Sequence, residues 1–245
     1  MSRIWGWLRY YLCRAPKWHA ATKASCWFGS NAATRIMNIL SPKFTESQFK
    51  ARVKLAEARG VNTFHLFLAN TSDGAGSGYR ADDAETAKVM DRRIRCIRKR
   101  GHAVVLWIVS DDSASWAREA GFVEAICKAA KRHGWFKQAS TVVAGLEMNE
   151  YWESSQARAA VETIRRYYGG KVGVHMTSGR RDYAAFADIL FYQVNPGLAA
   201  DRIRSETRAA LASGKPVNFF ELDRHENRHL CQAALDAGAF GVGNW

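Results

Sequence analysis

The fold is decided by residues 103–146, AVVLWIVSDDSASWAREAGFVEAICKAAKRHGWFKQASTVVAGL. This stretch holds an apolar, β-branched run from Ala103 to Val109, a segment of helical period from Trp116 to His133, and a second apolar run from Thr141 to Leu146. Two short apolar runs joined by a segment of helix length are typical of parallel strands connected by a crossover helix. The stretch therefore predicts one β–α–β unit of a parallel sheet.

The same alternation extends over the whole chain of 245 residues. The other predicted strands are Ala24 to Phe28, Val61 to Leu68, Lys171 to Met176, Ile189 to Val194, Pro216 to Glu221 and Ala239 to Val242. The other predicted helices are Glu46 to Arg59, Asp83 to Arg100, Ser155 to Tyr168, Asp182 to Ala187, Ala199 to Ala212 and Glu226 to Asp236. Glycines just past helix ends predict left-handed caps, at Gly60, Gly101, Gly134, Gly214 and Gly238.

Eight strands in this pattern can form a closed barrel or an open doubly wound sheet. The open sheet normally carries a G-x-G-x-x-G turn after its first strand, but the first strand here is followed by Gly29-Ser30-Asn31. The sequence therefore favours an α/β fold of the (β/α)8 TIM-barrel type, and the chain length suits a single domain.

The predicted barrel has eight strands but only seven following helices. The amphipathic segment Arg3 to Arg14 could fill the missing place. We therefore expect residues 1–22 to form an N-terminal helix packed on the barrel and residues 23–245 to form the catalytic barrel, as one domain overall.

The chain is strongly cationic, with a formal net charge of +13. Seven Lys/Arg residues face one acid, Asp91, between Lys88 and Arg100, while Met90, Ile94 and Ile97 recur at helical spacing. This pattern predicts an amphipathic helix with a basic outer face. Such a face is either simply solvated or attracts anions, and the sequence leaves both interpretations open.

The cysteine pattern and the N-terminal segment indicate the compartment in which the protein is made. Five cysteines without a C-x-x-C pair indicate no disulfide framework and a reducing compartment. The apolar segment Met1 to Leu12 is interrupted by arginines and is too short to cross a bilayer. We therefore expect no transmembrane segment, no clear signal peptide and synthesis in the cytoplasm.

Two predicted strands end in carboxylates, at the barrel end where active sites are built. One strand ends Gly145-Leu146-Glu147-Met148-Asn149-Glu150-Tyr151-Trp152, and another ends Val217-Asn218-Phe219-Phe220-Glu221-Leu222-Asp223. An Asn-Glu pair after the fourth strand and a Glu after the seventh resemble the clan A (4/7) retaining glycoside hydrolases. The Arg often found near the end of the second strand in that clan has no obvious counterpart.

The resemblance implies a role for each matching position. Glu150 would be the general acid/base, Asn149 the partner of the substrate 2-hydroxyl, and Glu221 the nucleophile. The remaining expected substrate contacts are Tyr192, as hydrogen-bond partner of the nucleophile, His175, Trp245 as a sugar platform, and the strand-end residues Trp152, Asn195, Asn70 and Asp111.

The two carboxylates have distinct tasks in this chemistry. One gives a proton to the leaving oxygen while the other attacks the anomeric carbon, and a separation of about 5 to 5.5 Å gives retention through a covalent intermediate. This mechanism needs no cofactor and no metal. The expected substrate is a polysaccharide. The positive charge would suit an anionic or cell-wall glycan, as for an endolysin-like enzyme that reaches the cell envelope after release, and no specific nucleic acid is expected.

Three other interpretations stay open. Glutamates at strand ends can simply cap helices or pair with arginine. The barrel could also bind a glycan or a protein without catalysis. His225-Glu226-Asn227-Arg228-His229 matches H-E-x-x-H and would suit a zinc hydrolase, but the 16 residues after it contain no His or Glu as third ligand.

Overall fold

The computed structural model describes residues 25–27, 39–58, 61–70, 78–110, 118–177, 182–193, 199–220 and 228–244. Eight parallel strands close into a barrel in the order β1-β10-β9-β8-β7-β6-β5-β2. They are β1 (Ser25–Trp27), β2 (Val61–Phe67), β5 (Ala103–Val109), β6 (Thr141–Gly145), β7 (Val172–Met176), β8 (Ile189–Gln193), β9 (Val217–Phe220) and β10 (Gly241–Asn244). The predicted TIM-barrel fold is therefore confirmed, and the helix expected in residues 1–22 lies outside the described residues.

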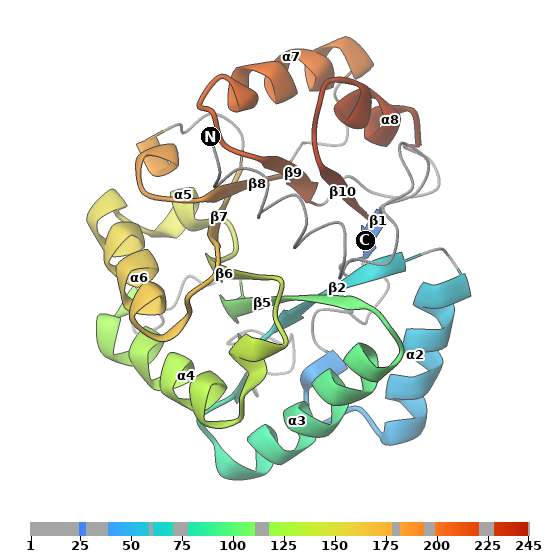
Figure 1. Cartoon of the computed structure of the whole chain (residues 1–245), viewed down its shortest axis with the longest axis vertical. Coiled ribbons are helices and arrows are strands. Elements are labelled where there is room, and N and C mark those ends of the chain that lie inside the picture. The colour runs from blue at the N-terminus through green and yellow to red at the C-terminus, as the bar shows by residue number, and fades with distance from the viewer. Residues whose placement is uncertain are drawn as a thin grey trace, which may run out of the picture.

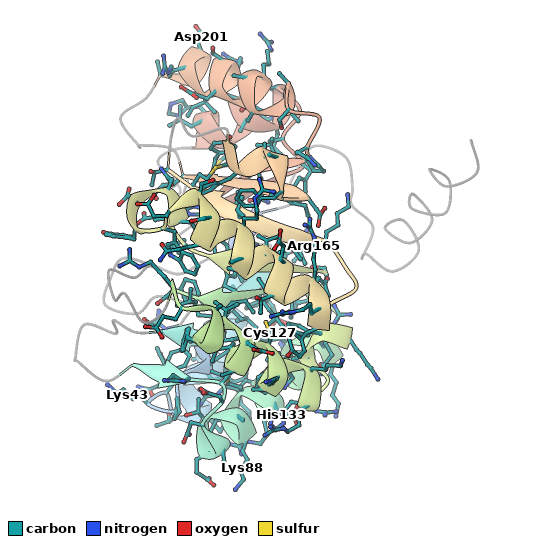
Figure 2. The ribbon with its side chains drawn as sticks, turned by 90° about the vertical axis from the view of Figure 1, so that its left-hand side faces the viewer. Lys43, Lys88, Cys127, His133, Arg165 and Asp201 are labelled. Atoms are coloured by element: carbon teal, nitrogen blue, oxygen red, sulfur yellow. The ribbon has the colours of Figure 1, made fainter. Side chains whose placement is uncertain are left out.

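Helices surround the barrel (Figure 1). They are α2 (Glu46–Ala58), α3 (Ala84–Lys99), α4 (Ala120–Arg132), α6 (Ser154–Tyr167), α7 (Ala200–Leu211) and α8 (Arg228–Asp236). Seen from the side, α4 and α6 lie next to each other on the outer wall, and Cys127 of α4 is buried (Figure 2). Within the described residues, no helix combines the length and apolar character needed to cross a membrane.

Three features differ from the predicted elements. A small antiparallel hairpin of β3 (Ala69–Asn70) and β4 (Tyr79–Arg80) follows β2, and a four-residue helix, α5 (Met148–Tyr151), lies between β6 and α6. The helix predicted over residues 182–187 is a 3-10 turn, η4 (Asp182–Ala185). It stays short because the next residues already join the sheet, where Asp188 N donates to Val172 O over 2.8 Å.

Capping residues explain where α3 begins and ends. Asp83 accepts a hydrogen bond from Thr86 N over 2.8 Å, and Gly101 follows the helix with a φ of 88°. The predicted left-handed glycines at 134, 214 and 238 are also confirmed, whereas Gly60 lies outside the described residues.

The basic face predicted for α3 needs one correction. Met90, Ile94 and Ile97 are buried as expected, but Arg93 is buried with them and is only 2% exposed. Its guanidinium donates hydrogen bonds to the carbonyl oxygens of Ile39, Ser41 and Phe44. Arg93 is therefore not part of the solvated face, because the chain before α2 turns its carbonyl groups toward α3.

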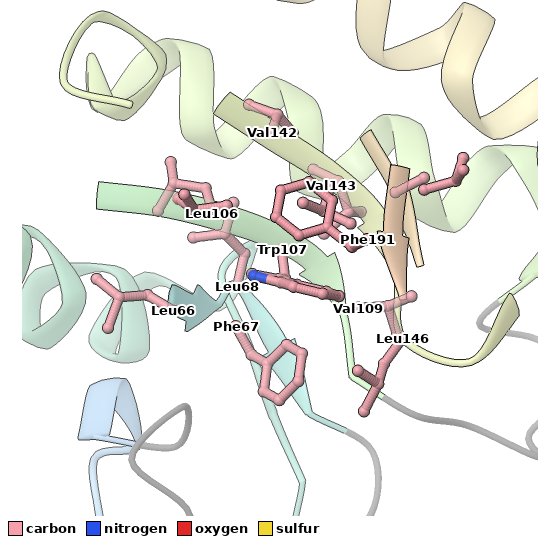
Figure 3. Packing of buried hydrophobic residues seen from close by; sticks show 14 of the residues in the cluster. Leu66, Phe67, Leu68, Leu106, Trp107, Val109, Val142, Val143, Leu146 and Phe191 are labelled. Carbon is pink, nitrogen blue, oxygen red and sulfur yellow. The ribbon is translucent and has the colours of Figure 1, made fainter. Parts of the chain in front are cut away.

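Aromatic rings fill the barrel interior around Trp107 in the middle of β5 (Figure 3). Its ring centroid lies 5.6 to 5.7 Å from those of His65, His175 and Phe191, which come from three other strands. Its Nε1 donates to His65 Nδ1 over 2.9 Å. The centre is thus a packed core, as in other TIM barrels, and a site must be built at its C-terminal rim.

Candidate functional site

The segment that follows β6 carries the predicted acid/base. β6 ends at Gly145, Glu147 then adopts a left-handed backbone with φ 44° and ψ 39°, and α5 presents Asn149 and Glu150. Glu150 is exposed and Glu147 is half-buried. Both glutamates therefore lie within five residues of the strand end, where TIM barrels place catalytic groups.

The end of β7 holds this segment from one side. Glu147 N donates to His175 Nδ1 over 2.8 Å. Asn149 and Thr177 form a reciprocal pair, in which Thr177 N donates to Asn149 Oδ1 and Asn149 Nδ2 donates to Thr177 Oγ1, each over 2.8 Å. The Asn149 amide, expected to meet a sugar hydroxyl, is thus engaged in fixing α5 to β7.

The C-terminal end of α5 is held as well. Tyr183 Oη donates to Trp152 O over 2.9 Å, and Arg118 Nη1 donates to Tyr151 O. These bonds satisfy carbonyl groups that a short helix would otherwise leave without partners. The backbone under Glu150 is therefore fixed at both ends.

His175 lies beneath the site rather than along its surface, since its side chain is 0% exposed. Burial lowers its pKa to about 3, because a charged imidazole would lose its hydration. Its Nδ1 accepts the Glu147 N–H, so the neutral ring carries its hydrogen on Nε2. His175 thus supports the turn at Glu147 instead of lining the site as expected.

Two other predicted substrate contacts are buried. Trp152 is 3% exposed and folds back toward Gly145, so its side chain packs in the core, whereas a substrate contact was expected. Asn70 is 1% exposed and accepts a hydrogen bond from Ser110 Oγ over 2.9 Å. These burials follow from α5 and the β3–β4 hairpin, which turn the chain back over the strand ends.

Tyr192 is also buried, and strand alternation indicates its direction. Phe191 faces the barrel interior, where its ring meets Trp107, so the next residue of β8 faces the helices. The inward position at the end of β8 belongs to Gln193, which is in register with Phe220 of β9. A hydrogen bond from Tyr192 to Glu221 stays a prediction, because Glu221 lies outside the described residues.

Four predicted site residues, Asp111, Asn195, Glu221 and Trp245, lie outside the described residues. β9 ends at Phe220, which directly precedes Glu221 in the chain. The roles of all four residues stay predictions.

The zinc motif is only partly described. His229 is exposed on α8, whereas His225 and Glu226 lie outside the described ranges. Among the residues that the structure describes, no three His, Cys, Asp or Glu side chains are grouped so as to hold a metal ion.

Sequence reasoning missed several residues around α5. They are Glu147, Thr177, Tyr183 and Arg118. Glu147 had a usable signal, since it directly follows the predicted strand end at Leu146 and this barrel end carries function. The other three had none, because their roles depend on contacts between segments distant in sequence.

No family model and no curated protein matches the sequence. Solved structures do match in fold. A structure titled as a complex of a GH113 beta-1,4-mannanase has a TM-score of 0.61 at 14% identity, covering 91% of this chain and 86% of that one. The GH113 beta-mannanase AaManA from Alicyclobacillus acidocaldarius has a TM-score of 0.58 at 15% identity, with coverages of 91% and 85%.

A third match is the exo-beta-1,4-mannosidase Op5Man5 from Opitutaceae bacterium strain TAV5. Its TM-score is 0.66 at 15% identity, covering 92% of this chain and 52% of that one. At these identities the likeness concerns the fold, which is a TIM barrel also found in glycoside hydrolases.

Proposed function

We propose that this protein is a retaining glycoside hydrolase that cleaves β-linked polysaccharides. The observation that carries the proposal is the end of β6, where a segment with two glutamates is fixed to β7 at the C-terminal rim of the barrel. The structural neighbours support it, since their names are those of mannanases, a mannosidase and a beta-glucosidase.

The proposed reaction has two steps. A glutamate after β6 protonates the glycosidic oxygen while Glu221 attacks the anomeric carbon, and water then releases the sugar from the covalent intermediate with retained configuration. The Asn149-Glu150 pair favours Glu150 as the proton donor by motif. A fixed backbone under the donor suits this chemistry, because a catalytic group must be held in place when the substrate arrives.

The net charge of +13 supports a further part of the proposal, that the glycan is anionic or belongs to a cell envelope. Such a substrate would place the site of action at the envelope. The charge acts through electrostatic attraction alone, so the substrate screen also includes neutral glycans.

The test is a screen of the wild-type protein against β-mannan, cellulose, chitin and peptidoglycan, with released reducing ends as the readout. We expect hydrolysis of one of these polymers, with the product anomer first formed keeping the β configuration in NMR. The Glu221→Gln variant should lose about 1,000-fold or more of this activity, since an amide cannot form the glycosyl ester.

A matched control is Glu162→Gln, which makes the same change at an exposed position on α6. It should keep wild-type activity. Binding of a glycan by the wild-type protein without any hydrolysis would instead indicate a non-catalytic binding barrel. Activity that is lost with EDTA and restored with Zn²⁺ would favour the zinc hydrolase.

A further inference from the structure

The backbone at Glu147 is unusual. Among the described residues it is the one non-glycine residue with a positive φ. L-amino acids disfavour this region because Cβ approaches the following carbonyl oxygen, and such conformations cluster at functional sites. A glycine would adopt the turn without strain, yet the position carries a carboxylate.

A buried contact holds Glu147 in this conformation. Its N–H points to Nδ1 of His175, which is fully buried in β7. Burial keeps the imidazole neutral, so its Nδ1 can accept this hydrogen bond. The contact therefore fixes the backbone of Glu147 beside the end of β7.

Position 147 also lies close to the inner face of the barrel wall in sequence. Val143 is in register with Trp107, and Gly145 with Val109, on the face that Trp107 turns to the interior. β6 ends at Gly145, so Glu147 is the second residue beyond the last inward-facing position of the strand and lies at the rim of the barrel. Glu150 comes one helical turn later, is exposed, and follows an asparagine that is engaged with Thr177.

We propose that Glu147, held by His175, is the catalytic proton donor at the end of β6. This inference rests on the proposed function. In the first step the Glu147 proton moves to the glycosidic oxygen as its bond to C1 breaks and a Glu221 oxygen bonds to C1. In the second step the Glu147 carboxylate takes a proton from water, the water oxygen bonds to C1, and Glu221 leaves as a carboxylate.

The test compares Glu147→Gln with Glu150→Gln on two substrates of the same sugar. One is the polymer hydrolysed by the wild-type protein, and the other is its 2,4-dinitrophenyl β-glycoside, whose leaving group needs no proton. For Glu147→Gln we expect a loss of about 100- to 10,000-fold on the polymer. The burst of dinitrophenol in the first step should remain.

Azide provides the second readout. As an anion it attacks C1 of the intermediate without needing a base, so it should accelerate turnover of the aryl glycoside by Glu147→Gln and yield a β-glycosyl azide. Glu150→Gln should show neither the leaving-group dependence nor the azide rescue of Glu147→Gln, and the control Glu162→Gln on α6 should keep wild-type activity on both substrates. Circular dichroism and unfolding temperatures of both variants separate a folding defect from a chemical one.

The outcomes are distinguishable. Leaving-group dependence and azide rescue in Glu150→Gln alone would overturn this inference and keep the proposed function. Full activity of a folded Glu147→Gln would do the same. A wild-type protein that hydrolyses no glycan and no aryl glycoside would remove both.

Discussion

At the scale of single residues, Gly173 on β7 packs closely against the ring of Phe191 inside the barrel. A Cβ atom at this position would lie 2.6 Å from Cε2 of Phe191. Gly173→Ala should therefore lower the free energy of unfolding by about 1 to 3 kcal/mol, because the ring must leave its place beside Trp107. Urea denaturation measures the change.

A matched control is Gly121→Ala in α4, where an added Cβ meets no atom within 4 Å. This variant should be neutral or gain at most about 1 kcal/mol from helix propensity. If Gly173→Ala were as stable as Gly121→Ala, the described position of the Phe191 ring would be contradicted.

Residue types at strand ends could be predicted from the sequence, but their exposure could not. Trp107, in the apolar run predicted as a strand from Ala103 to Val109, lies in the core. Trp152 and Asn70 were expected at the substrate and are buried, because segments without periodicity fold back over them. The left-handed backbone at Glu147 could not be predicted from the sequence, since glutamate does not favour that conformation as glycine does.

At the scale of elements, Arg93 ties α3 to the chain before α2. It is 2% exposed and donates to three backbone carbonyls, with Glu46 3.3 Å from its Nε. Arg93→Met keeps most of the volume but leaves those carbonyls without a donor. We expect a loss of about 3 kcal/mol or more in the free energy of unfolding, measured in urea.

The neighbouring Arg92 supplies the control, since its side chain is 61% exposed and lies 3.8 Å from Glu46. Arg92→Met should change stability by less than about 1 kcal/mol. Equal effects of the two substitutions would show that the carbonyl contacts of Arg93 contribute little.

Elements with a clear period were predicted well. The strand Ala103–Val109 has the predicted bounds, and α3 differs by one residue at each end. The hairpin β3–β4 and helix α5 were missed because elements of two to four residues are too short to show a hydrophobic period. These are the elements that shape the candidate site, so the site was less predictable than the barrel.

At the scale of the whole molecule, two neutral histidines inside the barrel make folding depend on pH. Burial lowers the pKa of His175 to about 3 and that of His65 well below 6.5. Below pH 6.5 both imidazoles therefore bind a proton in the unfolded chain but stay neutral in the folded protein. Each histidine should therefore remove stability as the pH falls, with a slope of up to about 1.4 kcal/mol per pH unit.

The variant His65→Gln isolates this effect, because an amide oxygen can still accept the hydrogen bond from Trp107. Between pH 6 and 5 its stability should fall less steeply than that of the wild-type protein, by about 1 kcal/mol per pH unit. Parallel stability curves would mean that His65 is protonated in the folded state.

Barrel closure could be anticipated from eight strand-like runs, but the pairing of β1 with β10 depends on segments at opposite ends of the chain. The charge of the whole molecule was likewise readable, whereas the burial of Arg93 was not. Sequence patterns thus predict local elements and the total charge, whereas the pairing of distant strands and the burial of single residues depend on three-dimensional contacts.

The most direct measurement is mass spectrometry of the protein after incubation with a 2,4-dinitrophenyl 2-deoxy-2-fluoro-β-glycoside of the sugar that it hydrolyses. The fluorine slows both steps by opposing positive charge at C1, and the good leaving group lets the first step proceed, so the covalent intermediate accumulates. We predict one glycosyl adduct on the peptide containing Glu221. Hydrolysis of the glycan without any adduct, or an adduct on another peptide, would contradict the account.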